Sequence, residues 1–240
     1  WNENEKRYNW ELVFCELYAG GKYQNNEGEN YEYSLGLNGL GSCATQYASE
    51  YFDARIHRDG FEYKLHFEKG KIVGELQKEP CKHKKTGSDF HWKPDLAVFT
   101  DINIPLEYYQ ETMKRQAVVN AGVTFTLRNE VGPDKFESTD YKYENGILDY
   151  VTEIAGEVTL STPTFIETER RGRDREDKPD YKVKLTAAFC FSNTVSRIEY
   201  YHSSSRLEYG GAPDKATKSA FVSAIDAYIK KVGKYQKSES

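Results

Sequence analysis

The sequence predicts an α+β fold in two layers. Some segments repeat apolar residues at helical spacing, whereas others alternate at the period of a strand. Residues 1–145 are predicted to run helix, glycine loop, helix, strands, helix and strand, and residues 146–240 to run helix, two or three strands and helix. Runs of strands between helices are typical of α+β domains. At 240 residues the chain can form two modest domains, and we place their boundary between residues 145 and 146.

The predicted elements begin with a short helix over residues 11–18, ended by the pair Gly20 and Gly21. A second helix is predicted to begin near Ser42. The apolar side of the first helix is expected to hold Phe14, Leu17 and Tyr18, and that of the second to hold Ala44, Tyr47, Ala48 and Tyr51.

Three glycines, Gly36, Gly39 and Gly41, stand directly before the second helix. Glycine lets another group approach the main chain closely, and the first turn of a helix offers unpaired N–H groups. Such a place binds anions, phosphate above all. The alternative is a tight turn before a packed helix, and the glycine pattern alone does not separate the two.

The segment that follows, residues 53–77, alternates at strand period, with Tyr63, Leu65 and Phe67 on one face. Hairpin turns are expected at Asp59-Gly60 and at Lys69-Gly70. After a basic loop over 80–88, a further strand, "DFHWKPD", is expected to end at Pro94.

A helix over residues 105–120 is indicated by the proline at its start and by Gly122 just beyond its end. A strand over 122–130 follows, and Asn145-Gly146 marks the next turn. The charged run 167–180 is expected to be a solvated hairpin tip. The last two elements are a strand with Val183, Leu185, Ala187, Phe189 and Phe191 on one face, and a helix from Pro213 to Gly233.

Composition narrows the classes of partner. The net charge is −5, so the chain gives no sign of a basic surface that would hold nucleic acid by itself. Four widely spaced cysteines form no metal-binding or disulfide pattern and are expected to be reduced and mostly buried, which favours the cytoplasm. The five histidines show no metal-ligand spacing. Neither a membrane span nor a signal peptide is evident, and the chain is expected to be a fragment of a longer protein.

Six blocks of the sequence resemble, in order and spacing, the B subunit of the bacterial type IIA topoisomerases, DNA gyrase and topoisomerase IV. They are "ELYAGGKY" (16–23), "YSLGLNGLG" (33–41), "HRDG" (57–60), "KKTGSDFHWKPDLAVF" (84–99), "YENGILDYV" (143–151) and "YGGAPDKATKSAFVSAIDAYI" (209–229). The resemblance implies a partial GHKL-type ATPase domain over 1–145, a two-layer α/β sandwich. It implies a partial transducer domain with a ribosomal-protein-like left-handed βαβ fold over 146–240.

The resemblance also implies roles for individual residues. The glycine stretch resembles the lid that wraps ATP, so the backbone of Gly36, Leu37, Asn38, Gly39, Leu40 and Gly41 would hold the phosphates. Lys22 resembles the lid lysine that meets a phosphate, and Tyr31 stands where the family has a tyrosine near the base. Ser88 matches a hydroxyl that fixes adenine through water, and Arg58 matches an arginine at the pocket mouth where aminocoumarins bind. If the resemblance to the family is set aside, the sequence gives ordinary surface or strand roles to Lys22, Tyr31 and Ser88.

Two departures from the family pattern lie in or beside the glycine stretch. Asn38 replaces the usual histidine, and Leu35 replaces a common glycine. The water-orienting carboxylate, the asparagine that holds Mg²⁺ and the adenine-reading aspartate are expected upstream of Trp1, so no catalytic residue is assigned here. We therefore expect the 240 residues alone not to hydrolyse ATP.

In the intact protein the resemblance implies ATP with Mg²⁺ as cofactors. It implies DNA and the topoisomerase A subunit as partners, dimerisation of the B subunit on ATP binding, no membrane, and a cytoplasmic location. The alternative is a diverged GHKL/transducer module that binds a partner without hydrolysing ATP. A mismatch-repair-type ATPase fits the "KTGS" and C-terminal blocks less well. Gyrase and topoisomerase IV are not separated.

Overall fold

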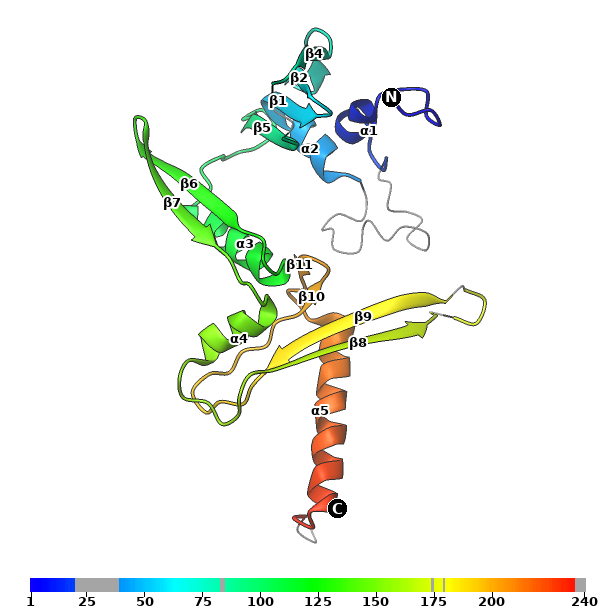
Figure 1. Cartoon of the computed structure of the whole chain (residues 1–240), viewed down its shortest axis with the longest axis vertical. Helices are drawn as coiled ribbons and strands as arrows, with labels where there is room; N and C mark the ends of the chain where they lie inside the picture. Colours follow the sequence, from blue (N-terminus) through cyan, green and yellow to red (C-terminus); the bar gives the residue numbers. More distant parts are fainter. Residues whose placement is uncertain (20–38, 83–84, 174, 179, 236–240) are drawn as a thin grey trace. The chain divides into compact units, whose positions relative to one another are not determined.

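The computed structural model divides into two compact units, Trp1–Leu106 and Glu107–Ser240 (Figure 1). The residues that the structure describes are 1–19, 39–82, 85–173, 175–178 and 180–235. The division between Leu106 and Glu107 differs in place from the domain boundary expected between residues 145 and 146, which stays a prediction.

In its described residues, the first unit is an antiparallel sheet with two short helices. Its elements are α1 (Asn9–Cys15), α2 (Gly41–Tyr47), β1 (Ser49–Arg58), β2 (Phe61–Glu68), β3 (Lys71–Ile72), β4 (Gln77–Pro80) and β5 (Gly87–Pro94). The strand order is β3-β2-β1-β5, and β4 also pairs with β2. The strand predicted to end at Pro94 is β5.

Both hairpin turns expected in this sheet are present. Asp59 and Gly60, which connect β1 to β2, have φ of 53° and 79°. Lys69 and Gly70, which connect β2 to β3, have φ of 48° and 83°. Two successive positive φ angles match the right-handed twist of the flanking strands, and glycine adopts them at little cost.

The core of the first unit lies between α1 and the sheet. Phe14 of α1 packs with its ring centroid 5.5 Å from that of Phe52 and 6.1 Å from that of Phe67. Burial of three aromatic rings provides a large part of the apolar area that this small unit removes from water. The full cluster of buried residues is Phe14, Phe52, Ala54, Leu65 and Phe67.

The predicted apolar sides of the two helices need correction. Helix α1 ends at Cys15, so Leu17 and Tyr18 lie beyond it and are more than half exposed. In α2, Ala44 and Tyr47 face solvent, while Cys43 and Gln46 are buried. The buried side is therefore rotated by one residue and includes a polar side chain that an apolar count does not select. Of the four cysteines, only Cys43 is buried.

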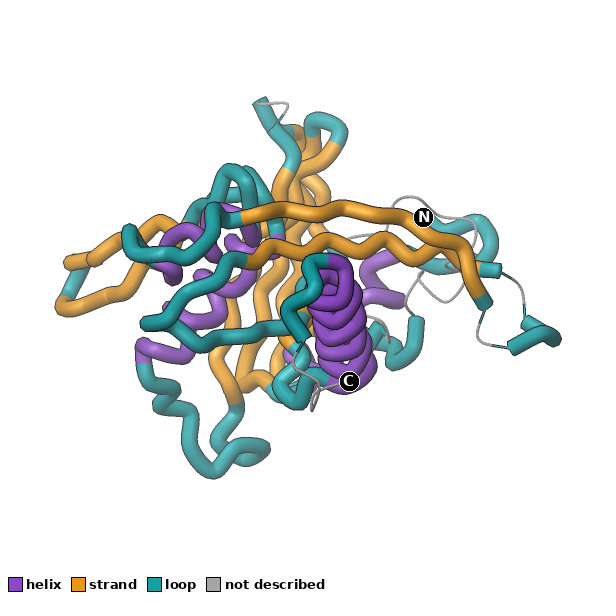
Figure 2. Tube along the Cα trace, turned by 90° about the horizontal axis from the view of Figure 1, so that it is seen from below, coloured by secondary structure: helices purple, strands orange, loops and turns teal. Residues whose placement is uncertain are grey.

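The second unit consists of three helices and three separate hairpins. The helices are α3 (Leu106–Val119, whose first residue lies in the first unit), α4 (Ile147–Ala155) and α5 (Gly211–Lys231). The hairpins are β6 (Phe125–Gly132) with β7 (Lys135–Tyr141), β8 (Thr164–Gly172) with β9 (Tyr181–Phe189), and β10 (Tyr201–His202) with β11 (Ser205–Arg206). Figure 2 shows the long β8–β9 ribbon and the continuous helix α5.

The β8–β9 hairpin differs in part from expectation. Residues 167–172, expected in a hairpin tip, belong to strand β8, and the turn begins at Arg173. Val183 and Leu185 do share a face, but they are 43% and 50% exposed. Phe189 meets Phe221 of α5 with ring centroids 5.3 Å apart, so strand and helix do touch. The left-handed βαβ arrangement of a transducer stays a prediction.

Candidate functional site

The glycine stretch is described only at its C-terminal end. Gly39 has φ of 60°, a left-handed conformation that favours glycine. Leu40 is the N-cap of α2, and its carbonyl accepts the first helical hydrogen bond, from Ala44 N at 2.8 Å. The expected site residues that lie outside the described part of the chain are Lys22, Tyr31, Gly36, Leu37 and Asn38.

The start of α2 leaves room for another group beside the main chain. Gly41 is its first residue, and a Cβ atom built there would meet no atom of the described residues within 4 Å. The first N–H groups of a helix have no intrahelical acceptor. Gly41 therefore combines available amides with open space, which is what close approach of an anion requires.

Arg58 and Ser88 lie on the face of the sheet that carries α1. Ser88 pairs with Ile56 in the β1–β5 ladder, and paired residues point to the same face. Alternate residues of a strand share a face, so Ile56 and Arg58 of β1 lie on the same face as the buried Phe52. Arg58 is mostly exposed, with its Nε 3.5 Å from Asp59 Oδ2. The structure thus places these two expected site residues on one face.

The other face of the sheet carries a polar cluster that the sequence reading did not assign. His66 Nδ1 lies 2.6 Å from Asp53 Oδ1, and His66 Nε2 lies 3.4 Å from Glu68 Oε1. The hydrogen bond with Asp53 raises the pKa of His66 above its usual value, although partial burial opposes the shift. Strand alternation could have placed these residues together, since Asp53 and His66 are direct partners in the β1–β2 ladder. Within the described part of the chain, no group of His, Cys, Asp or Glu side chains could hold a metal ion.

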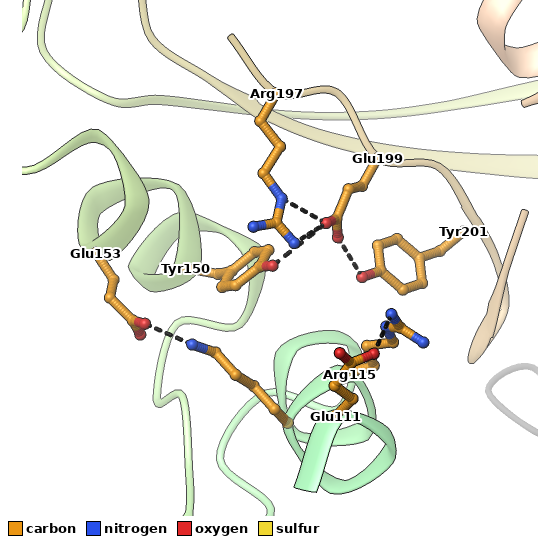
Figure 3. A network of polar contacts seen from close by, with 8 residues as sticks. Glu111, Arg115, Tyr150, Glu153, Arg197, Glu199 and Tyr201 are labelled. Carbon is orange, nitrogen blue, oxygen red and sulfur yellow. Dashed lines mark hydrogen bonds and ion pairs between the residues drawn. The ribbon is translucent and has the colours of Figure 1, made fainter. Parts of the chain in front are cut away.

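A buried carboxylate, Glu199, organises a polar network in the second unit (Figure 3). Its Oε1 accepts a hydrogen bond from Arg197 Nε at 2.7 Å, and its Oε2 accepts one from Tyr201 Oη at 2.7 Å. Tyr150 Oη of α4 lies 3.4 Å from Oε1. Burial favours a higher pKa for Glu199, but the hydrogen bonds from Tyr201 and Arg197 outweigh it and keep the pKa below its usual value.

A second carboxylate, Glu153 of α4, accepts two hydrogen bonds on separate oxygens. Lys114 Nζ lies 2.6 Å from its Oε1, and Tyr143 Oη lies 2.6 Å from its Oε2. Burial would raise the pKa of Glu153, but these two donors hold it below its usual value. Burial and the neighbouring carboxylate raise the pKa of Tyr143, so its hydroxyl stays a donor at neutral pH.

Comparisons with known proteins bear on the class of this chain. Residues 146–240 match the family model for DNA gyrase B. The chain is 28% identical over 226 residues to the B subunit of DNA topoisomerase 4 from Enterococcus faecalis, covering 93% of this chain and 31% of that protein.

Two solved structures have a similar fold. One is the topoisomerase IV ATP-binding domain of Francisella tularensis in complex with a small-molecule inhibitor, with 22% identity, a TM-score of 0.66, and coverage of 96% of this chain and 56% of that chain. The other is the 43K ATPase domain of Thermus thermophilus gyrase B in complex with an aminocoumarin, with 21% identity, a TM-score of 0.64, and coverage of 86% and 54%.

The chain therefore shares the fold of these two domains, and its mixed helices and strands agree with the predicted α+β class. The chain is similar over most of its length to B subunits of bacterial type II topoisomerases, and both gyrase and topoisomerase IV are among the proteins it resembles. It spans about a third of the length of the topoisomerase 4 relative and about half of each solved domain. Among the described helices, none combines the length and the apolar content that crossing a bilayer requires.

Proposed function

We propose that this chain is part of the ATP-binding B subunit of a bacterial type II DNA topoisomerase. In the intact enzyme, ATP binding and hydrolysis close a gate between two B subunits and drive one DNA duplex through another. The observation that carries the proposal is similarity over 93% of the chain to the B subunit of a topoisomerase 4. The shared fold with an ATP-binding domain supports it. The alternative, a module that binds a partner without hydrolysing ATP, has no observation in its favour.

The nucleotide would be held chiefly by main-chain amides. The left-handed Gly39 and the open space at Gly41 fit the close approach of a phosphate. The side chains proposed to complete the site are Lys22 toward a phosphate, Tyr31 near the base, Ser88 toward adenine through water, and Arg58 at the pocket mouth. The amides proposed to hold the phosphates are those of Gly36, Leu37, Asn38, Gly39, Leu40 and Gly41.

ATP with Mg²⁺ supplies the binding energy of the closed state and the phosphoanhydride bond that is hydrolysed. The residues of this chain bind and position the nucleotide, and we propose that the Mg²⁺ ligands and the water-orienting carboxylate belong to another part of the full-length protein. The proposed partners are the A subunit, the DNA that both subunits handle, and a second copy of the B subunit. A ligand shifts a conformational equilibrium only by its differential affinity for the two states, so ATP must bind the closed dimer more tightly than the open one.

The test is a plasmid assay with the intact B subunit and its A subunit. We expect relaxation or supercoiling that requires both subunits, ATP and Mg²⁺, and we expect no ATP turnover by the 240-residue chain alone. Plasmid topology that is unchanged by the complete mixture, although the two proteins bind each other, would refute the proposal. Steady ATP turnover by the isolated chain would refute the assignment of the catalytic groups to another part of the full-length protein.

A further inference from the structure

Helix α3 packs tightly against residues that follow the expected domain boundary at 145 and 146. Ala117 and Val118 of α3 are 0% and 1% exposed, and Tyr150 of α4 is 9% exposed. Together with Ala155 they are the buried apolar residues in the described part of the second unit. Buried apolar residues of this unit therefore stand on both sides of the boundary between the two expected domains.

The backbone makes the closest approach at Gly146, the N-cap of α4. A Cβ atom there would lie 3.1 Å from the carbonyl oxygen of Val118 and 3.2 Å from the Cβ of Ala121. Gly146 also has φ of 56°, which side chains other than glycine rarely adopt. The end of α3 and the start of α4 thus approach each other closely at Gly146.

Polar contacts fix the same two helices beside this packing. Glu153 of α4 accepts a hydrogen bond from the Lys114 ammonium of α3 and another from the Tyr143 hydroxyl, in the segment that precedes α4. Each donor lies 2.6 Å from the carboxylate oxygen that accepts it. Lys114 Nζ also lies 5.6 Å from the centroid of the Tyr150 ring. Lys114 of α3 therefore contacts α4 through an ion pair and a cation–π contact, and Tyr143 adds a hydrogen bond from the segment before α4.

A third contact joins α3 to the C-terminal half of this unit. Gln116 Nε2 donates a hydrogen bond of 3.1 Å to the carbonyl oxygen of Ser204, which lies between β10 and β11 and is 6% exposed. Residues 114–118 of α3 thus contact the protein at three places within the stretch that matches the gyrase B family model. Chains of packed side chains and hydrogen bonds are the physical means by which one site biases another.

We propose that this α3–α4 joint, formed by Lys114, Val118, Tyr143, Gly146 and Glu153, transmits the nucleotide state from the ATPase part to residues 146–240. Glu153 is its positioning residue and acts through Lys114 and Tyr143. This inference rests on the proposed function, since it concerns the coupling of ATP use to DNA passage. It predicts that the joint can be weakened so that ATP is still hydrolysed but DNA is passed less often.

The experiment compares Glu153→Gln with Glu111→Gln in the intact B subunit assembled with its A subunit. Glu111 pairs with Arg115 at 2.7 Å, one turn away within α3, so the control removes the same charge from an ion pair that does not join the two helices. The readouts are ATP turnover, DNA passages per ATP hydrolysed, and the melting temperature of each variant.

For Glu153→Gln we expect ATP turnover within about twofold of the wild type and a fall of about fivefold in DNA passages per ATP, in line with usual coupling energies. Glu111→Gln is expected to match the wild type in that ratio. The double variant that combines Lys114→Glu with Glu153→Lys restores an ion pair between the helices. It is expected to recover most of the lost coupling.

Two results would overturn the inference while the proposed function stands. One is an unchanged ratio in Glu153→Gln, with or without a lower melting temperature, which would make the joint structural only. The other is an equal fall in both single variants. A wild-type enzyme without any ATP-dependent DNA passage would instead remove the proposed function, and the coupling role with it.

Discussion

Tyr201 Oη donates a hydrogen bond of 2.7 Å to Glu199 Oε2, and the Glu199 side chain is only 9% exposed. The other oxygen of the same carboxylate accepts a hydrogen bond from Arg197 Nε. A buried carboxylate with two donors is stabilising only while both donors remain, because removing partners leaves a buried charge without compensation. Glu199 therefore ties residues 197–201 to one conformation beside α4.

Replacing Glu199 by glutamine is expected to lower the free energy of unfolding by about 2 kcal/mol at pH 7, since hydrogen bonds to charged groups are stronger than neutral ones. The folded-state pKa of Glu199 lies below its usual value of 4.5. Its contribution is therefore complete above about pH 4.5 and is lost as the pH falls through the lower folded-state pKa. Urea unfolding of both proteins at a series of pH values checks this, and a difference that grows below pH 4.5 would contradict it.

Alanine at position 146 is expected to destabilise the chain by about 1–3 kcal/mol, the usual cost of a strained backbone conformation. Gly146 has a positive φ, and the Cβ of an alanine there would lie 3.1 Å from Val118 O. Thermal unfolding of Gly146→Ala measures the effect. Gly172→Ala is the matched control, since a Cβ at Gly172 meets nothing within 4 Å. Equal melting temperatures for the two variants would show that the approach at Gly146 is not tight.

Gln46 of α2 is fully buried, and neither polar atom of its side chain has a hydrogen-bond partner among the described residues. A buried polar group without a partner costs free energy that an apolar group of similar shape does not. Gln46→Met is therefore expected to raise the free energy of unfolding of the 240-residue chain by about 1 kcal/mol. Chemical denaturation tests this, and a clear loss of stability would mean that the amide has a partner in solution.

Local turn and capping signals allowed much of the fold to be predicted. Asp59-Gly60 and Lys69-Gly70 are hairpin turns because glycine accepts the positive φ that such turns need. Helix α3 follows Pro105 and is succeeded by Gly122, as the capping pattern indicated. These signals depend on a few neighbouring residues, so the sequence is sufficient to identify them.

Features that depend on tertiary packing were predicted less well. The buried side of α2 includes Gln46, which no count of apolar residues would select. Strand β7 was missed because its residues are polar and largely exposed, and it is held by pairing with β6. Tyr150, which contacts Glu199, and Lys114, which pairs with Glu153, come from distant parts of the chain, so neither network could be recognised from spacing alone.

Arg58 and Ser88 share a face of the sheet, as follows from the pairing of Ser88 with Ile56 and from the alternation along β1. Their proposed link to the glycine stretch stays a prediction, because Lys22, Tyr31 and most of that stretch lie outside the described residues.

The most direct test of the proposed site is the affinity of the intact B subunit for a non-hydrolysable ATP analogue, measured by calorimetry for the wild type, Gly41→Val and Gly172→Val. A Cβ atom at either glycine meets no described atom within 4 Å, so the two positions are matched in the space at the main chain. If amides at the start of α2 hold the phosphates, Gly41→Val weakens binding by about tenfold or more, the cost of roughly 1.4 kcal/mol, and Gly172→Val leaves it unchanged. Equal affinities for all three proteins would contradict the account.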